Sequence, residues 1–92
     1  MVTTEMNEIR TPAEEDAATE AAVLQQLLFL YPVQLNFEEL RRELAGDAGD
    51  FGERDALERA VRDLTSTGLL HRNGELLVPT RAALRFDELL GG

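Results

Sequence analysis

The fold of this chain is decided by residues 57–90, LERAVRDLTSTGLLHRNGELLVPTRAALRFDELL, which form one continuous supersecondary pattern. A helical pattern ends at Gly68, because glycine suits the left-handed conformation that follows many helices. A strand begins at Leu69-Leu70, and Asn73-Gly74 predicts a tight hairpin turn in which both of these residues have positive φ. The strand returns, and Thr80 is expected to be the N-cap of a last helix. The stretch therefore predicts a helix, a hairpin and a second helix.

Two helices and a short strand are predicted upstream of this stretch. Thr11-Pro12 is typical of a helix start, because threonine caps free backbone N–H groups and proline suits the first helical position. Val33-Gln34-Leu35 alternates in polarity and is expected to form a small strand that joins the sheet of the hairpin. Asn36 and Glu39 have the spacing of a capping box, which predicts the start of the second helix. The acidic, glycine-punctuated residues 46–52 are predicted to form a loop.

The composition indicates one globular domain. The chain has 92 residues, of which 43% are hydrophobic, and a formal net charge of −9. We expect a flexible polar tail at residues 1–10 and a single domain at residues 11–90. The tail lacks the apolar core of a secretory signal, and the longest apolar run, residues 23–31, is too short to span a bilayer. We therefore expect a cytoplasmic protein that makes no contact with a membrane.

From Ala13 to Leu90 this order of elements resembles the winged-helix superfamily, in particular small bacterial and archaeal regulators. The resemblance implies a mainly α fold with a small β-wing. Its winged helix-turn-helix order is helix, short strand, helix, helix, β-hairpin, helix. It also implies that the third helix enters the DNA major groove and that the wing touches the backbone or minor groove. One departure is the long connection between the second and third helices, which carries Asp47 and Asp50 and opposes the approach of phosphates.

The candidate nucleic-acid-binding residues lie on the third helix and beside the wing turn. Arg59, Arg62 and Ser66 project opposite the buried face of the helix, and Arg72 precedes the turn by one residue. Arginine offers a two-pronged donor to guanine or phosphate, which suits such a role. The alternative is a solvated helix face in which each arginine is neutralised by an acid four residues earlier. The pairs expected in that case are Asp55 with Arg59 and Glu58 with Arg62.

The first helix has an apolar face wider than one small domain readily buries. The candidate interface residues on this face are Val23, Leu27, Phe29 and Leu30. We expect the last helix to cover the surplus within one chain, and the alternative is a second copy in a homodimer. The residues expected to provide the internal cover are Phe86, Leu89 and Leu90.

The residue inventory argues against catalysis and cofactor binding. The chain has no cysteine, one histidine, His71, and one serine, Ser66. A thiolate site is therefore excluded, and neither a metal site nor a nucleophilic triad has the partners it needs. We expect a non-enzymatic protein with no catalytic residues, no metal site, no cofactor and no evident small-molecule substrate.

The charge balance separates the two functional hypotheses that remain. The chain has 18 acidic residues against 9 basic residues, every one of them arginine. Such a surface repels polyphosphate at long range, so we expect a winged-helix regulatory module that acts mainly through protein–protein contacts. The alternative is a DNA-binding transcriptional regulator that reads DNA with the third helix and wing. That alternative is favoured if Arg54, Arg59, Arg62 and Arg72 form one uninterrupted basic surface.

Overall fold

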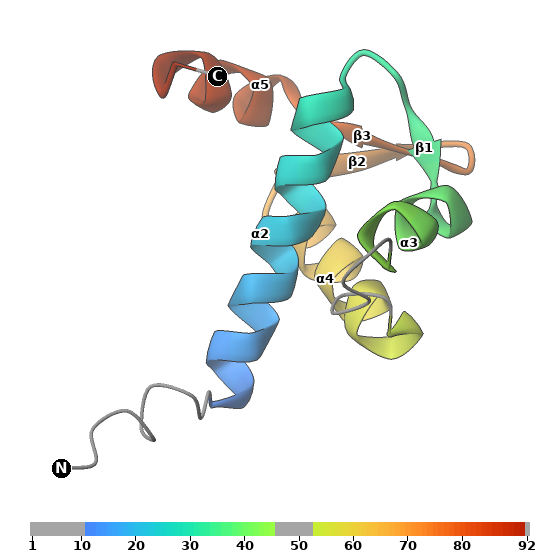
Figure 1. Ribbon diagram of the computed structural model, residues 1–92. Helices are drawn as coiled ribbons and strands as arrows, with labels where there is room; N and C mark the ends of the chain where they lie inside the picture. Colours follow the sequence, from blue (N-terminus) through green and yellow to red (C-terminus); the bar gives the residue numbers. More distant parts are fainter. Residues whose placement is uncertain (1–10, 46–52, 92) are drawn as a thin grey trace, which may run out of the picture.

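The computed structural model describes residues 11–45 and 53–91. Within these residues the chain is mainly helical, with a small antiparallel sheet (Figure 1). The elements are α2 (Pro12–Leu30), β1 (Leu35–Asn36), α3 (Phe37–Ala45), α4 (Arg54–Ser66), β2 (Leu70–Asn73), β3 (Leu76–Pro79) and α5 (Arg81–Leu89). This is the predicted order of elements, and it is compatible with a winged helix. The predicted tail and the predicted loop, which includes Asp47 and Asp50, lie outside the described residues.

Side-chain caps begin α2 and α3 where the sequence places them. Thr11 accepts a hydrogen bond from the backbone N–H of Glu14, and Glu14 Oε1 accepts one from the N–H of Thr11, at 3.1 and 3.0 Å. The predicted capping box is confirmed, because Asn36 Oδ1 and Glu39 Oε1 accept from each other's backbone N–H at 2.8 and 2.9 Å. Each box satisfies two of the N–H groups that a helix start leaves free.

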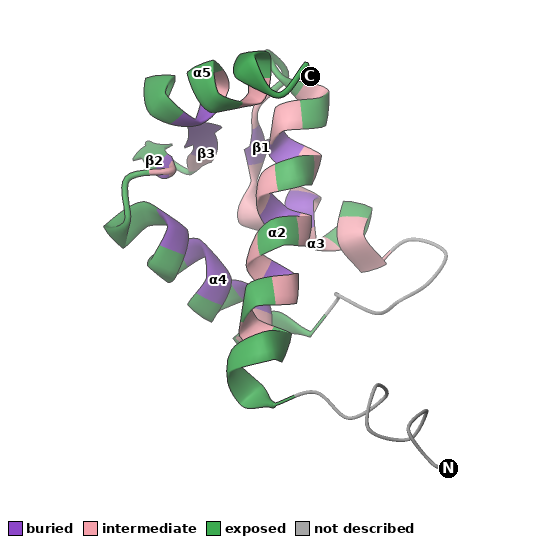
Figure 2. Cartoon of the chain, turned by 90° about the vertical axis from the view of Figure 1, so that its left-hand side faces the viewer, coloured by how far each residue is buried: buried purple, intermediate pink, exposed green. Residues whose placement is uncertain are grey.

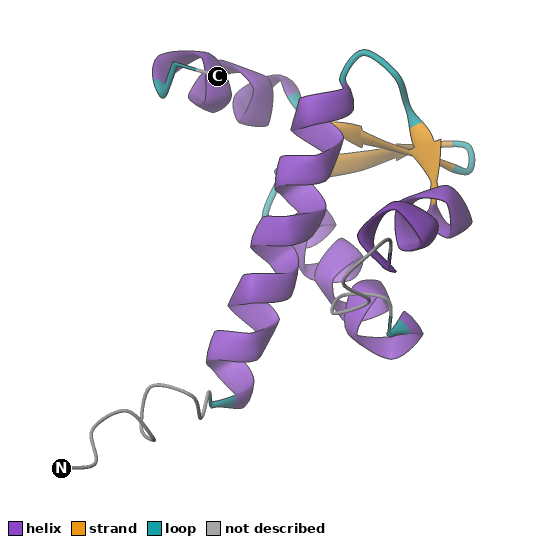
Figure 3. Ribbon diagram, viewed as in Figure 1, coloured by secondary structure: helices purple, strands orange, loops and turns teal. Residues whose placement is uncertain are grey.

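The sheet has β3 at its centre, in the order β1-β3-β2, with both pairs antiparallel. Leu77 of β3 pairs with Leu35 on one side and with Arg72 on the other. The strands lie beside the C-terminal half of α2 (Figure 3). The predicted strand at residues 33–35 joins this sheet as expected, but it is shorter and lies further along the chain, at Leu35–Asn36.

The hairpin turn differs from its prediction by one residue. Asn73 is the last residue of β2 and pairs with Leu76, so the two turn residues are Gly74 and Glu75. Gly74 has φ 65°, and within the described residues no residue other than glycine has positive φ. A positive φ at the first turn position, filled by glycine, is the pattern of a type II′ turn. This register adds the Asn73–Leu76 pair to the ladder and spares asparagine the left-handed conformation.

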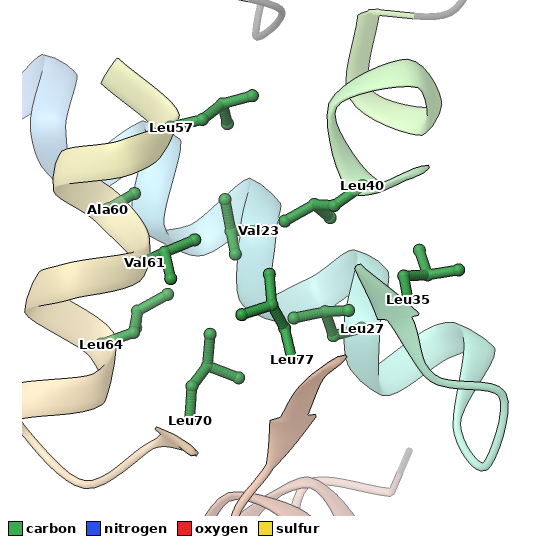
Figure 4. Packing of buried hydrophobic residues seen from close by; sticks show 10 residues of the cluster. All are labelled: Val23, Leu27, Leu35, Leu40, Leu57, Ala60, Val61, Leu64, Leu70 and Leu77. Atoms are coloured by element: carbon green, nitrogen blue, oxygen red, sulfur yellow. The ribbon is translucent and has the colours of Figure 1, made fainter. Parts of the chain in front are cut away.

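The core forms where α2 crosses α3, α4 and the sheet (Figure 2). Figure 4 shows its side chains pointing toward one another from all of these elements. The third helix buries the face predicted for it, and Phe37 and Leu44 of α3 are half-buried at the edge. The buried members of the cluster are Val23, Leu27, Leu35, Leu40, Leu57, Ala60, Val61, Leu64, Leu70 and Leu77.

The last helix does not cover α2, contrary to the prediction. In both Figure 1 and Figure 2, α5 follows β3 and lies apart from α3 and α4. It packs on β3 through Ala83, which is buried, and Leu84, which is half-buried. Phe86, Leu89 and Leu90, the expected cover, are 61%, 65% and 70% exposed. The prediction was wrong because the chain leaves β3 in a direction that turns these side chains toward solvent.

Thr80 joins α5 to the end of α4, which leads to a first testable prediction. Its hydroxyl donates to the carbonyl of Gly68 at 2.7 Å and accepts from the N–H of Ala83 at 3.2 Å. We expect Thr80→Ala to lower the free energy of unfolding by about 1–2 kcal/mol, measured by urea titration. Thr80→Ser is the matched control, because it keeps both hydrogen bonds. An equal loss in both variants would contradict the role given to the hydroxyl.

Candidate functional site

Three of the four predicted nucleic-acid-binding residues are brought together in one surface depression. Arg62 and Ser66 of α4 and Arg72 of β2 line it, together with Glu58 and Thr65, and its volume is about 540 Å³. We call this the α4–β2 depression. Neither Arg62 nor Arg72 forms an ion pair with any residue that the structure describes. Two guanidinium groups beside a serine hydroxyl give the depression the donors that a phosphate accepts from.

Arg59 lies elsewhere, although it belongs to the same helix. Arg59 Nη2 is 3.3 Å from Asp16 Oδ1 of α2, and this contact lies at a separate depression near Pro12 and Glu15. The predicted pairing of Arg59 with Asp55 is therefore replaced by a pairing with Asp16. An ion pair between side chains four residues apart on one helix is weak, so an acid on a neighbouring helix can replace the acid of that pair. Here the packing of α2 against α4 supplies Asp16.

Arg54 is surrounded by acidic and aromatic groups. It forms ion pairs with Glu38 of α3 and with Glu58, the latter at 3.8 Å, and its guanidinium lies 5.3 Å from the centroid of the Phe37 ring. Its hydrogen bond to Glu38 holds the pKa of that carboxyl below the ordinary value. Glu58 was the predicted partner of Arg62 and instead contacts Arg54.

The arginines of this side of the domain are therefore divided among separate sites. Arg54 lies with Glu38 and Glu58, Arg59 lies with Asp16, and Arg62 lies with Arg72 in the α4–β2 depression. Within residues 11–45 and 53–91 these side chains do not form one uninterrupted basic surface. The condition that would favour DNA binding is thus not met there.

A group of acidic residues lies where α2 meets α4. Partial burial raises the pKa of Glu20 above its ordinary value, and the neighbouring charges of Asp63 and Asp16 and a hydrogen bond with Asp63 raise it further. Of these acids, Asp16 is paired with Arg59. The remaining carboxylates, Glu20 and Asp63, repel each other when both are ionised.

This repulsion predicts a pH-dependent contribution to stability. Because the pKa of Glu20 is higher in the folded than in the unfolded chain, its contribution is present below the ordinary pKa of 4.5 and is lost as the pH rises through the folded pKa. We expect Glu20→Gln to raise the free energy of unfolding at pH 7 by about 0.2–1 kcal/mol, since the group is partly exposed. Urea titrations at acidic and neutral pH measure this change. Glu75→Gln removes the same charge in the hairpin turn, and an equal gain there would contradict the local cause.

The predicted interface residues on α2 are divided between core and surface. Val23 and Leu27 are 0% and 1% exposed and belong to the core, so they offer no surface to a partner and are removed from the predicted interface. Leu30 is half-buried against the core. Phe29 points outward and is 81% exposed. Phe29 is thus the member of the set that a partner can reach most fully.

The exposed apolar surface lies mainly on α5, although the sequence predicts that the apolar residues of this helix are covered within the chain. Phe86, Leu89 and Leu90 recur at i, i+3 and i+4, and exposed Ala82 lies one turn before Phe86. We call these residues the α5 stripe. The sequence signal was available, because the apolar residues of α5 fall on two faces of the helix. One face has positions 82, 86, 89 and 90, and the other has Ala83 and Leu84.

The other large exposed apolar side chains lie at the same end of the molecule. Within the described residues they are Phe29, Tyr31 and Val33, at the C-terminal end of α2 and just beyond it. Both Figure 1 and Figure 2 place this end of α2 near α5. A depression of about 310 Å³, lined by Gln25, Leu28, Phe29 and Asp87, separates the two helices. The exposed apolar surface is therefore concentrated and not scattered.

Comparison of the chain with protein-family models, curated proteins and solved structures gives no match. None of the described helices combines the length and the apolar character needed to cross a membrane. Among the described side chains, no group of three or more histidine or acidic residues is arranged to hold a metal ion.

Proposed function

We propose that this chain is a non-enzymatic winged-helix regulatory module that acts mainly through protein–protein contacts. The observation that carries the proposal is the α5 stripe, where Phe86, Leu89 and Leu90 are all more than half exposed. Monomeric proteins rarely leave several large apolar side chains together in water unless a partner covers them. The stripe therefore favours a protein partner over a polyanion.

The winged-helix part of the proposal is supported by topology. A short strand between the first two helices pairs with the returning strand of the hairpin, and the hairpin directly follows the third helix. In such a domain the hairpin is the wing, and α4 is the helix that faces a ligand. The non-enzymatic part is supported by the residue inventory, with no cysteine and a single histidine. The compartment that belongs to this proposal is the cytoplasm.

Electrostatics also favours a protein partner. The formal net charge is −9, and Arg54 and Arg59 are both engaged by acids from other elements. A nucleic-acid surface needs several cations that are free to replace the counterions of phosphates. The described part of α4 and β2 offers Arg62 and Arg72 for that purpose, and Glu58 lines the same depression.

Site-specific photocrosslinking tests the proposal. A photoreactive phenylalanine analogue at position 86 is compared with the same analogue at position 62, in the full chain expressed in its own host. We expect protein adducts at position 86 and few at position 62. Absence of protein adducts at position 86, with nucleic-acid adducts at position 62, would overturn the proposal.

The α4–β2 depression supports a second candidate, a DNA-binding regulator that uses Arg62, Ser66 and Arg72. For the leading proposal we expect a random duplex library at low salt to be retained weakly and without a preferred sequence. A tight, reproducible motif that is lost in Arg62→Ala and Arg72→Ala, and weakened by salt, would favour the second candidate. Arg59→Ala is the matched control, because Asp16 already engages that arginine.

A further inference from the structure

We propose that Ser66 is a phosphorylation site, and that Arg62 and Arg72 bind its phosphate within the α4–β2 depression. Ser66 is the last residue of α4, and all three side chains line this depression. The anion held there is then a phosphoryl group that the chain itself carries. The inference goes beyond the proposed protein contacts, because it concerns how the module is regulated.

Ser66 is the middle one of three consecutive residues with hydroxyl groups. Thr65 Oγ1 donates to the carbonyl of Val61 at 2.7 Å, and Thr67 Oγ1 donates to the carbonyl of Leu64 at 3.2 Å. The Ser66 hydroxyl forms no hydrogen bond with any residue in the described part of the chain. Phosphoryl transfer needs a hydroxyl oxygen that is free to attack, and Ser66 offers one without breaking a bond.

The C-terminal end of α4 is accessible to an enzyme. Residues 65–68 are all exposed, and Gly68, at φ 87°, ends the helical stretch. The backbone there is held by hydrogen bonds from the N–H of Thr67 to the carbonyl of Asp63 and from the N–H of Gly68 to the carbonyl of Thr65, at 3.0 and 3.2 Å. Helix ends of this kind open locally at little cost in free energy. A protein kinase can therefore reach the Ser66 hydroxyl without unfolding the core.

The proposed modification is an ordinary phosphoryl transfer from a nucleoside triphosphate held by a protein kinase of the host. Ser66 Oγ attacks the γ-phosphorus, and the bond from that phosphorus to the oxygen bridging the β- and γ-phosphates breaks. The nucleoside diphosphate leaves, and the hydroxyl proton passes to a base of the kinase. The product has up to roughly two negative charges and three strong acceptor oxygens.

The two arginines come from opposite walls of the depression. Arg62 precedes Ser66 by four residues, so the two side chains are neighbours on one face of α4. Arg72 belongs to β2. Since neither arginine forms an ion pair within residues 11–45 and 53–91, neither has to leave a partner to bind the phosphate. Each guanidinium group can donate two hydrogen bonds to phosphate oxygens.

Two acids and the helix dipole oppose a phosphate at this position. Glu58 lines the depression, but it lies two turns before Ser66, about 12 Å along the axis, with Arg62 between them. Asp63 precedes Ser66 by three residues and shares a hydrogen bond with Glu20 on the α2 side instead of lining the depression. The C-terminal end of a helix also disfavours negative charge. Binding of the phosphate therefore depends on the two arginines.

Phosphorylation changes what the α4–β2 depression can bind. Once Arg62 and Arg72 hold the phosphate of Ser66, they no longer replace the counterions of an external polyanion. We expect the phosphorylated chain to retain a DNA duplex at low salt about 10-fold less than the unmodified chain does. The α5 stripe has no residue in this depression, so contacts made through the stripe are expected to continue.

The first test measures the surroundings of the phosphate. Phosphoserine is encoded at position 66 of the full chain, and phosphorus NMR follows its second ionisation, whose ordinary pKa is about 6. The arginines favour the dianion and lower this pKa, so the double variant Arg62→Gln, Arg72→Gln is expected to raise it by about 0.5–1. Both arginines are exposed, so the variant is expected to fold. Arg59→Gln is the matched control, because Asp16 engages that arginine. An equal pKa in all three chains would overturn the binding of the phosphate by these arginines.

The second test asks whether the modification occurs. The full chain is purified from its own host with phosphatases inhibited, both from growing and from starved cells, and is mapped by tandem mass spectrometry. We expect one phosphoryl group at position 66, which is absent in Ser66→Ala. The inference fails if no phosphoryl group is found there in either state, or if it is confined to Thr65 or Thr67. Crosslinking at position 86 is independent of this result, so the proposed function can stand when the inference fails.

Discussion

Leu77→Ala is expected to lower the free energy of unfolding by about 2–5 kcal/mol, which is a large part of the stability of a small domain. Leu77 is fully buried in the central strand β3, and its neighbours in the ladder are Leu35 and Arg72. Truncation removes buried methyl groups and leaves a cavity. The surrounding elements cannot close this cavity, because β1, β2 and β3 meet there. Chemical denaturation with urea measures the change.

Leu89→Ala is the matched control for this prediction. It makes the same chemical change on the exposed stripe of α5, where the side chain is 65% exposed. We expect it to change the free energy of unfolding by less than about 0.5 kcal/mol. Similar losses in both variants would mean that α5 is packed more closely than the structure has it.

Leu27→Glu is expected to unfold the domain, whereas Phe29→Glu is expected to leave it folded, although the two positions are two residues apart on α2. Leu27 is 1% exposed, so a glutamate there must either be buried without a partner or force the core open. The cost of several kcal/mol is comparable to the whole stability of the domain, and we expect Leu27→Glu to be largely unfolded. Circular dichroism and thermal melting measure this loss.

Phe29→Glu is expected to remain folded, because Phe29 is 81% exposed and already faces water. If Phe29 extends the apolar surface around α5, this variant weakens the binding of the proposed protein partner and leaves melting nearly unchanged. A folded Leu27→Glu would contradict the placement of Leu27 in the core. An unfolded Phe29→Glu would contradict the exposure of Phe29.

The two candidate surfaces are built from different residues, so they can be altered independently. The α4–β2 depression is lined by Arg62, Ser66 and Arg72, and none of its lining residues belongs to α5. Leu89→Asp is therefore expected to leave any retention on DNA unchanged, and Arg62→Ala is expected to leave protein crosslinking at position 86 unchanged. The functional candidates are thus distinguishable by variants of the same chain.

The sequence alone determined the local elements and their order. Caps are local, because a side chain at one position reaches the backbone three residues away, and Asn36–Glu39 and Thr80 were read correctly for that reason. The buried face of α4 followed from helical spacing. The turn was misplaced by one residue, because Asn-Gly and Gly-Glu both satisfy a two-residue hairpin and the ladder chooses between them.

The tertiary structure decided the partners and the exposed faces. The spacing on α4 offered Asp55 to Arg59, but the packing of α2 brought Asp16 closer. The sequence shows that Phe86, Leu89 and Leu90 are apolar and lie on one side of the last helix. It does not show which side of that helix meets the sheet, and in the structure these three side chains are exposed. An apolar side chain has the same sequence signature whether its own chain or a partner covers it. Only the direction in which the chain leaves β3 separates those cases, and that direction is set by packing among distant residues.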